Sequence, residues 1–217
     1  MHVAVFASGG GTNLQSLLDS CRPPEPVDIA LVLSNNPDAG ALERARSARV
    51  ATHVIDDPAD GPAILQVLED AQVDLVVLAG YLKLVPNEVV QRFGGRMVNI
   101  HPAMLPAFGG KGMYGTRVHR AVLDAGATVS GVTIHMVDER YDEGPIIAQW
   151  PVPVHHADTP ETLAARVLDV EHEILTAVVL AAARHGAVVP LHVSRPAFAS
   201  AATADVTKSF AITSQRQ

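Results

Sequence analysis

Cysteine is almost absent from this sequence, because Cys21 is the one such residue among 217. A single cysteine excludes an internal disulfide framework and any metal site built on a CxxC pair, and it is compatible with a reducing compartment. Aromatic residues make up 4% of the chain and charged residues 18%, against 48% apolar residues. This balance is typical of a globular protein with a substantial core rather than of a disordered chain.

Basic residues are also scarce, since 16 Lys and Arg stand against 23 Asp and Glu and give a formal net charge of -7. Binding to a nucleic-acid backbone normally needs a basic face, so we expect no nucleic acid as the main partner. The apolar run of residues 2–7 is short and has no basic segment before it, which argues against a signal peptide or a membrane span. We therefore expect a cytoplasmic protein.

Short apolar, β-branched runs alternate with amphipathic helical patterns along the first half of the chain. The runs cover residues 2–7, 28–34, 51–55 and 73–80, and the helical patterns cover 12–21, 39–48, 63–71 and 87–93. Strands that read as continuous apolar runs are covered on both faces. The fold class we predict is α/β, with a doubly wound, mostly parallel sheet and helices on both faces.

The pattern changes in the second half of the chain. A helical pattern over residues 115–126 precedes two longer extended segments, 128–137 and 145–154, which we expect to form an antiparallel edge. A long helix is then predicted between Thr159, a good N-cap residue followed by proline, and Gly186, a typical stop signal.

One domain accounts for most of the chain in this interpretation. We expect it to cover residues 1–190, with no internal repeat and no long linker. Residues 191–217 lose the hydrophobic period and become rich in Ala, Ser and Thr, so we expect a C-terminal tail that is peripheral or poorly ordered.

The glycines of "FASGGGTNL", residues 6–14, lie where the first predicted strand turns into the first helix. Backbone N–H groups there, together with the helix dipole, can form an anion site. The segment is neither the dinucleotide fingerprint, because Leu14 takes the third glycine position, nor a Walker A loop, because no lysine follows. A monophosphate is the favoured ligand, and the alternative is a tight turn that needs glycine whatever it binds.

Two polar side chains end the apolar strand in "VNIHPAMLP", residues 98–106. Asn99 and His101 alternate with Ile100, so both leave the same face of the strand, where ligands bind in open α/β sheets. An amide beside an imidazole can stabilise an oxyanion and move a proton near neutral pH. Asp142, in the acidic segment "DERYDEGPII", is the candidate third group.

Structural roles are the alternative at each of these positions. Asn99 could cap a turn, His101 could be a buried core histidine, and the acidic segment around Asp142 could be a solvated turn. From spacing alone, the residues indicate a transferase or a hydrolase that acts on a small phosphorylated substrate.

Several segments together are similar to the phosphoribosylglycinamide formyltransferase family, the folate-dependent formyltransferases of purine synthesis. They are "SGGGTNLQSLL", "SNNPDAGALERA", "VVLAGYLKLVP", "NIHPAMLPAFGGKGMYG", "VHRAVL", "GVTIHMVDERYDEGPII" and "RVLDVEHEILTAVV". The resemblance runs in order from residue 1 to about 190 and does not include the tail.

This resemblance implies a formyltransferase fold and an activity. The formyl group of 10-formyltetrahydrofolate, a co-substrate, would pass to the amino group of glycinamide ribonucleotide (GAR) through a tetrahedral intermediate. By similarity Asn99, His101 and Asp142 would be the catalytic residues, and no metal is implied. We expect a monomer or a homodimer with these two small molecules as its partners.

The resemblance also implies two binding sites. The residues assigned to GAR are Gly10, Gly11, Thr12, Asn13 and Glu171. The residues assigned to the folate are Tyr81, Leu82, Lys83, Leu84, Val85, Asn99, Asp138, Glu139, Arg140 and Tyr141. We expect His119 and His135 to be structural or supporting residues, and Lys111 to be a phosphate partner or an exposed loop lysine.

Two other kinds of function remain possible. Another formyl-folate enzyme, a formyltetrahydrofolate hydrolase or a methionyl-tRNA formyltransferase, would share an Asn-x-His pair and a downstream Asp, but it normally carries a further domain for which we expect no room. A non-catalytic nucleotide-binding module would keep the glycine loop without turnover.

Overall fold

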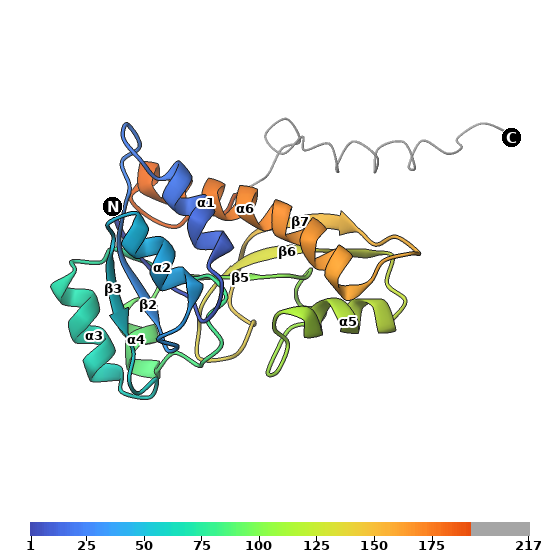
Figure 1. The fold of residues 1–217 in the computed structure, drawn as a ribbon, viewed down its shortest axis with the longest axis horizontal. Coiled ribbons are helices and arrows are strands. Elements are labelled where there is room, and N and C mark those ends of the chain that lie inside the picture. Colours follow the sequence, from blue (N-terminus) through green and yellow to red (C-terminus); the bar gives the residue numbers. More distant parts are fainter. Residues whose placement is uncertain (192–217) are drawn as a thin grey trace, which may run out of the picture.

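The computed structural model describes residues 1–191 of the chain (Figure 1). The elements are β1 His2–Phe6, α1 Thr12–Ser20, β2 Asp28–Ser34, α2 Gly40–Ser47, β3 Ala51–Val54, α3 Gly61–Asp70, β4 Leu75–Leu78, α4 Asn87–Arg92, β5 Met97–His101, α5 Thr116–Asp124, β6 Val129–Met136, β7 Ile146–Pro153 and α6 Pro160–His185. The predicted tail lies outside the described residues except for Leu191, whose backbone N–H donates to the carbonyl of Ile147 at 2.8 Å.

Within residues 1–191, seven strands form one sheet in the order β3-β2-β1-β4-β5-β6-β7. The five strands from β3 to β5 are parallel, whereas β6 runs antiparallel to β5 and β7 antiparallel to β6. The predicted mostly parallel sheet with an antiparallel edge is therefore confirmed. Because β1 lies between β2 and β4, the order of the strands reverses beside β1, which is where ligands bind in doubly wound folds.

Helices cover both faces of the sheet, as the continuous apolar strands predict (Figure 1). In β1, Val3 and Val5 pack into a core with α1, α2, α5 and α6, whereas Ala4 and Phe6 pack into a second core with α3 and α4. This alternation follows from the two-residue period of a strand. No helix of residues 1–191 has the length and apolar character needed to cross a membrane.

The long helix α6 forms one wall of the cavity that is described in the next subsection. Its start is a capping box, in which the Thr159 hydroxyl accepts from the Thr162 amide at 3.3 Å and the Thr162 hydroxyl accepts from the Thr159 amide at 2.9 Å. It ends at Gly186, which has a φ of 73°. The predicted helix limits are confirmed, and α6 packs against α1 and α5. The hydrogen bond from Asn13 to Glu171 shows that the middle of α6 faces the N-terminus of α1.

Candidate active site

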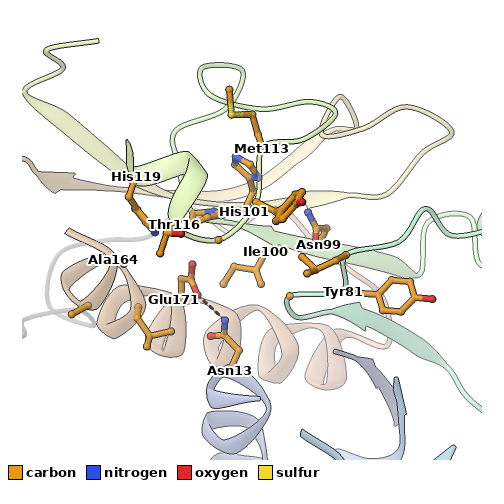
Figure 2. Close-up of a pocket in the computed structure, with 17 residues that line it drawn as sticks. Asn13, Tyr81, Asn99, Ile100, His101, Met113, Thr116, His119, Ala164 and Glu171 are labelled. Atoms are coloured by element: carbon orange, nitrogen blue, oxygen red, sulfur yellow. Dashed lines mark hydrogen bonds between the residues drawn. The ribbon is translucent and has the colours of Figure 1, made fainter. Parts of the chain in front are cut away.

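A cavity of about 350 Å³ opens at the carboxyl end of β5 (Figure 2). Its walls come from the first turn of α1, the segment after β4, the end of β5, the segment before α5, α5 itself and α6. The polar side chains in this wall are Asn13, Asn99, His101, His119 and Glu171, with a few hydroxyls beside them. Asn99 and His101 both lie on β5, whereas the other three residues come from α1, α5 and α6, and the fold brings these four elements together.

Asp142 stands at the centre of the predicted catalytic residues. Its Oδ2 lies 3.6 Å from Nδ1 of His101 and accepts a hydrogen bond from the Gly110 amide at 2.8 Å, while its Oδ1 lies 3.4 Å from Nδ2 of Asn99. The backbone of Asp142 is left-handed with a φ of 57°, a conformation that Asp tolerates better than most residues. The structure thus brings Asn99, His101 and Asp142 together.

Two glycines allow the loop that carries Asp142 to fold back onto the sheet. A Cβ at Gly144 would collide with the carbonyl oxygen of Met136, and a Cβ at Gly109 would lie 2.5 Å from Leu105 and 3.2 Å from the Cβ of Asp142. Side chains at either position would therefore push the carboxylate away from β5.

His135 on β6 belongs to the same cluster. The antiparallel register pairs His135 with Asn99, and its Nε2 lies 3.0 Å from Nδ2 of Asn99 and 3.5 Å from Oδ1 of Asp142. Its Nδ1 lies 2.8 Å from the carbonyl oxygen of Met136, an acceptor, so the hydrogen-bond network assigns the proton to Nδ1. Nε2 then accepts from the Asn99 amide, and this bond orients that amide.

The protonation of His101 and Asp142 follows from their surroundings. Burial, with a smaller contribution from His135, lowers the pKa of His101 overall although the Asp142 carboxylate and the Phe108 carbonyl act to raise it, so the imidazole is mainly neutral at pH 7. Burial acts to raise the pKa of Asp142, but contacts with His135, His101 and the Gly110 amide lower it overall. A neutral imidazole therefore faces an ionised carboxylate.

Both ring nitrogens of His101 point at oxygen atoms. Nε2 donates to the carbonyl of Phe108 at 2.9 Å, and Nδ1 faces Asp142. A proton added at Nδ1 would lie between the ring and the carboxylate, which would favour the imidazolium form. The arrangement can therefore take up a proton at His101 and hold the resulting charge.

Glu171 and Asn13 form the far wall of the cavity. Glu171 is 9% exposed, and its Oε2 accepts from Nδ2 of Asn13 at 2.7 Å (Figure 2). Burial raises the pKa of Glu171 to about 7, against a smaller opposite effect of the Asn13 hydrogen bond. The Oδ1 of Asn13 and the Nδ1 of His119 are buried and have no hydrogen-bond partner in the described part of the chain. Both atoms have almost no exposed surface, so a ligand in the cavity would reach them only after a side-chain rearrangement.

The predicted phosphate loop lies at the N-terminus of α1, beside this cavity. Gly10, Gly11 and Thr12 do not line the cavity, although Asn13, the next residue, does. Gly11 has a φ of 72°, and a Cβ there would lie 2.6 Å from the Cα of Ala41 on α2. Glycine is therefore needed at Gly11 for structural reasons, whatever the loop binds. At Gly10 a Cβ would meet open space, so packing does not explain a glycine there.

Most of the residues predicted to bind folate line a second, smaller cavity of about 70 Å³. They are Tyr81, Lys83, Leu84, Val85, Asn99, Asp138, Arg140 and Tyr141. Leu82 instead lines the larger cavity, and Glu139 lies outside both and accepts from the side chain of Gln91 at 3.1 Å. Lys111 is exposed in the segment before α5 and lines neither cavity. Asn99 and Tyr81 line both cavities, so the two spaces meet at the end of β5.

Some residues of the site were not among the predicted site residues. His135 reaches Asn99 only through the β5–β6 register, and a sequence pattern does not reveal the register of two strands. Arg44 donates from Nε to the carbonyl of Gly10 at 2.8 Å, which supports the glycine loop from α2. The sequence has no local signal for Arg44, because it lies on α2, the second helix after the glycine loop, and reaches Gly10 only through the packing of α2 beside α1.

In the described part of the chain, no group of three or more His, Cys, Asp or Glu side chains is arranged to hold a metal ion.

Comparisons with known proteins agree on one family. The family model described as "Formyl transferase" matches residues 1–179. A chloroplastic phosphoribosylglycinamide formyltransferase of Arabidopsis thaliana is 49% identical over 185 residues, which cover 82% of this chain and 63% of that protein. The phosphoribosylglycinamide formyltransferase of Escherichia coli strain K12 is 34% identical over 186 residues, which cover 82% of this chain and 85% of that protein.

Solved structures show the same fold. Glycinamide ribonucleotide transformylase 1 from Symbiobacterium toebii superimposes with a TM-score of 0.78 at 41% identity, covering 85% of this chain and 88% of that one. Phosphoribosylglycinamide formyltransferase from Anaplasma phagocytophilum gives a TM-score of 0.80 at 36% identity, covering 85% and 87%. The chain spans about 60% of the length of the two chloroplastic relatives, at 63% and 59%.

Proposed function

Because this chain belongs to the formyl transferase family, we propose that it transfers the formyl group of 10-formyltetrahydrofolate to the amino group of GAR in purine biosynthesis. The observation that carries the proposal is the position of Asn99, which lines both cavities with His101 and Asp142 beside it. Two substrates placed in these cavities would bring their reacting ends to the same three side chains.

GAR would occupy the larger cavity. Its phosphate would lie on the N-terminus of α1 near Gly10, where backbone amides and the helix dipole favour an anion. Its sugar hydroxyls would face Glu171, Asn13 and His119, which line this cavity. A carboxylate accepts hydrogen bonds from hydroxyl groups, whereas a side-chain amide and a neutral imidazole each have both a donor and an acceptor, so the three form a suitable set for binding hydroxyl groups.

The folate would occupy the smaller cavity, between residues 80–85 and 138–142. A cavity of about 70 Å³ is too small for a ligand of this size, since such pockets normally measure about 300 to 1,000 Å³. Leu84 and Tyr141, which line this cavity, are 48% and 42% exposed, so the folate would bury apolar surface against them. The opening that this needs would come from a shift of residues 138–141, while residues 80–85 keep their place.

The reaction exchanges one nitrogen for another at the formyl carbon. The amine of GAR forms a bond to that carbon, the carbonyl electrons move to oxygen, and the bond to N10 of the folate then breaks as the carbonyl re-forms. The amine loses one proton and N10 gains one, so the atoms and charges balance. The protein must stabilise an oxyanion and carry a proton from one nitrogen to the other.

The geometry suggests how the three side chains share this work. Neutral His101 can accept the proton of the attacking amine, and Asp142 stabilises the imidazolium that results. Asn99 and the protonated ring can then donate to the oxyanion. For Nε2 of His101 to do so, its hydrogen bond to the Phe108 carbonyl must be exchanged, which requires residues 102–115 to shift when substrates bind.

Formation of formyl-GAR from the protein, GAR and 10-formyltetrahydrofolate tests the proposal directly. Wild-type protein should consume the two substrates in equal amounts, and folded His101→Ala protein should be slower by about a hundredfold or more. Release of formate without GAR would instead identify a formyltetrahydrofolate hydrolase. Binding of GAR with no formyl transfer would identify a non-catalytic nucleotide-binding module.

The wider organisation of the protein follows from the same proposal. One formyltransferase domain would cover residues 1–190, and the protein would act in the cytoplasm as a monomer or a homodimer. These three statements remain predictions, and the residue assignments to GAR and folate are part of the proposal.

A further inference from the structure

Ser8 connects the end of β1 to the segment that follows β4. Its backbone N–H donates to the carbonyl of Gly80 at 3.0 Å, and its hydroxyl oxygen accepts from the backbone N–H of Leu82 at 2.9 Å. The same hydroxyl donates to Oδ1 of Asn35, just after β2, at 2.6 Å. One side chain therefore joins segments that follow three neighbouring strands of the parallel sheet.

The direction of these bonds is determined by chemistry. A hydroxyl carries one hydrogen, and Oδ1 of Asn35 can only accept, so the hydrogen of Ser8 points to Asn35. The lone pairs of the oxygen are left for the Leu82 amide. The turn that holds Asn35 is itself fixed, because the Asn36 amide donates to the hydroxyl of Ser34 at 3.1 Å. The Ser8 hydroxyl is thus committed to its two partners rather than to the glycine loop.

The segment 80–85 has little else to define its shape. Among the described residues, the two bonds to Ser8 are the only hydrogen bonds that these six residues make with the protein. Tyr81 packs its ring edge-on against Phe6 at 5.2 Å between ring centroids, while Leu82 and Leu84 are about half exposed. The conformation of this segment therefore depends on Ser8 more than on any other polar contact.

We propose that Ser8 is a positioning residue that holds residues 80–85 in the conformation that receives the formyl donor. The inference rests on the proposed function, because it takes the smaller cavity as the donor site. Four of these six residues line that cavity, so a change in the segment changes the shape of the site. Ser8 itself lines neither cavity and acts through the Leu82 amide.

Removal of the hydroxyl gives a specific kinetic signature. Ser8→Ala should raise the KM for 10-formyltetrahydrofolate about fivefold, which is the factor expected for the loss of one ordinary hydrogen bond. The kcat and the KM for GAR should change by less than about twofold. In the free protein, hydrogen exchange at the Leu82 amide should become faster. Ser8→Thr keeps the hydroxyl and should restore both values.

Ser16→Ala is the matched control. Ser16 is also partly buried, and its hydroxyl makes two hydrogen bonds, to the carbonyl of His172 and to the hydroxyl of Thr176, between α1 and α6. Its loss should lower thermal stability without a selective change in the KM for the donor. A general loss of packing would make the two alanine variants behave alike.

Two results would overturn the inference while the proposed function stands. One is an active Ser8→Ala protein with an unchanged donor KM, and the other is a Ser8→Thr protein no better than Ser8→Ala. By contrast, wild-type protein that neither transfers the formyl group nor binds 10-formyltetrahydrofolate in calorimetry would overturn the proposed function itself. The wild-type control therefore separates the two failures.

Discussion

Replacement of Glu171 by glutamine should stabilise this protein at pH 8 while weakening its binding of GAR. The Glu171 side chain is buried against α1, and its one hydrogen-bond partner is the neutral amide of Asn13. Among residues 1–191 no cation is paired with it, so an ionised carboxylate there is poorly compensated. Glutamine keeps the shape and an acceptor for Nδ2 of Asn13, and its own amide can donate to the free Oδ1 of Asn13.

The size of the effect follows from the pKa. Burial raises the pKa of Glu171 from 4.5 to about 7, which corresponds to about 3 kcal/mol of free energy of unfolding. The folded state binds the proton more tightly than the unfolded state does. The contribution to stability is therefore fully present below pH 4.5 and is lost as the pH rises to about 7. Glutamine has no such loss.

Thermal unfolding of both proteins between pH 4.5 and 8.5 measures this difference. The gain in Tm of Glu171→Gln over wild type should be small at pH 4.5 and should reach about 6 to 12 °C above pH 7. Asp169→Asn is the control, because Asp169 lies on the same helix and is exposed. The difference in Tm between Asp169→Asn and wild type should not rise with pH in this way.

A gain that is the same at every pH would refute the reasoning, because it would show that Glu171 keeps an ordinary pKa in the folded protein. A loss of stability above pH 7 would show that the carboxylate is compensated by a group that the structure does not place beside it. In kinetic assays, Glu171→Gln should raise the KM for GAR and leave that for the folate unchanged, since only the larger cavity contains Glu171.

The remaining predictions concern the reacting groups and the glycine loop. Asp142→Asn should lower kcat by about a hundredfold and change the acidic limb of the pH–rate profile, because the carboxylate that stabilises a charged His101 is lost; binding constants should change little. His101→Ala should lower kcat at least as much in a folded protein. Gly10→Ala should raise the KM for GAR without a change in Tm, since its Cβ meets open space. Gly11→Ala should lower Tm instead, because its Cβ would contact Ala41.

Each of these has a result that would contradict it. Unchanged turnover of Asp142→Asn between pH 5 and 9 would make Asp142 an ordinary turn residue, and near-normal turnover of His101→Ala would remove it from the chemistry. Equal effects of Gly10→Ala on the KM of both substrates would count against a phosphate at the glycine loop. A Gly11→Ala protein with wild-type Tm would show that α2 can move away from α1.

The elements of this fold could be predicted from the sequence because their signals are local. Continuous apolar runs identify strands that are covered on both faces, and the period of the following segments identifies helices. The Thr159–Pro160 start and the Gly186 end of α6 needed no tertiary information, since capping groups act within one turn. Asn99 and His101 were also identifiable, because the alternation of a strand puts both on one face at its carboxyl end.

Only the tertiary structure decided how distant residues meet. The register between β5 and β6 places His135 against Asn99, and a shift of one residue would have turned it to the other face of the sheet. The packing of α6 over α1 buries Glu171 and raises its pKa, which an exposed helix position would not do. Ser8 finds Leu82 because parallel strands end at the same edge of the sheet. Each of these contacts depends on how distant strands and helices are placed relative to one another. No local sequence signal encodes that placement, because it is set by the packing free energy of the whole fold.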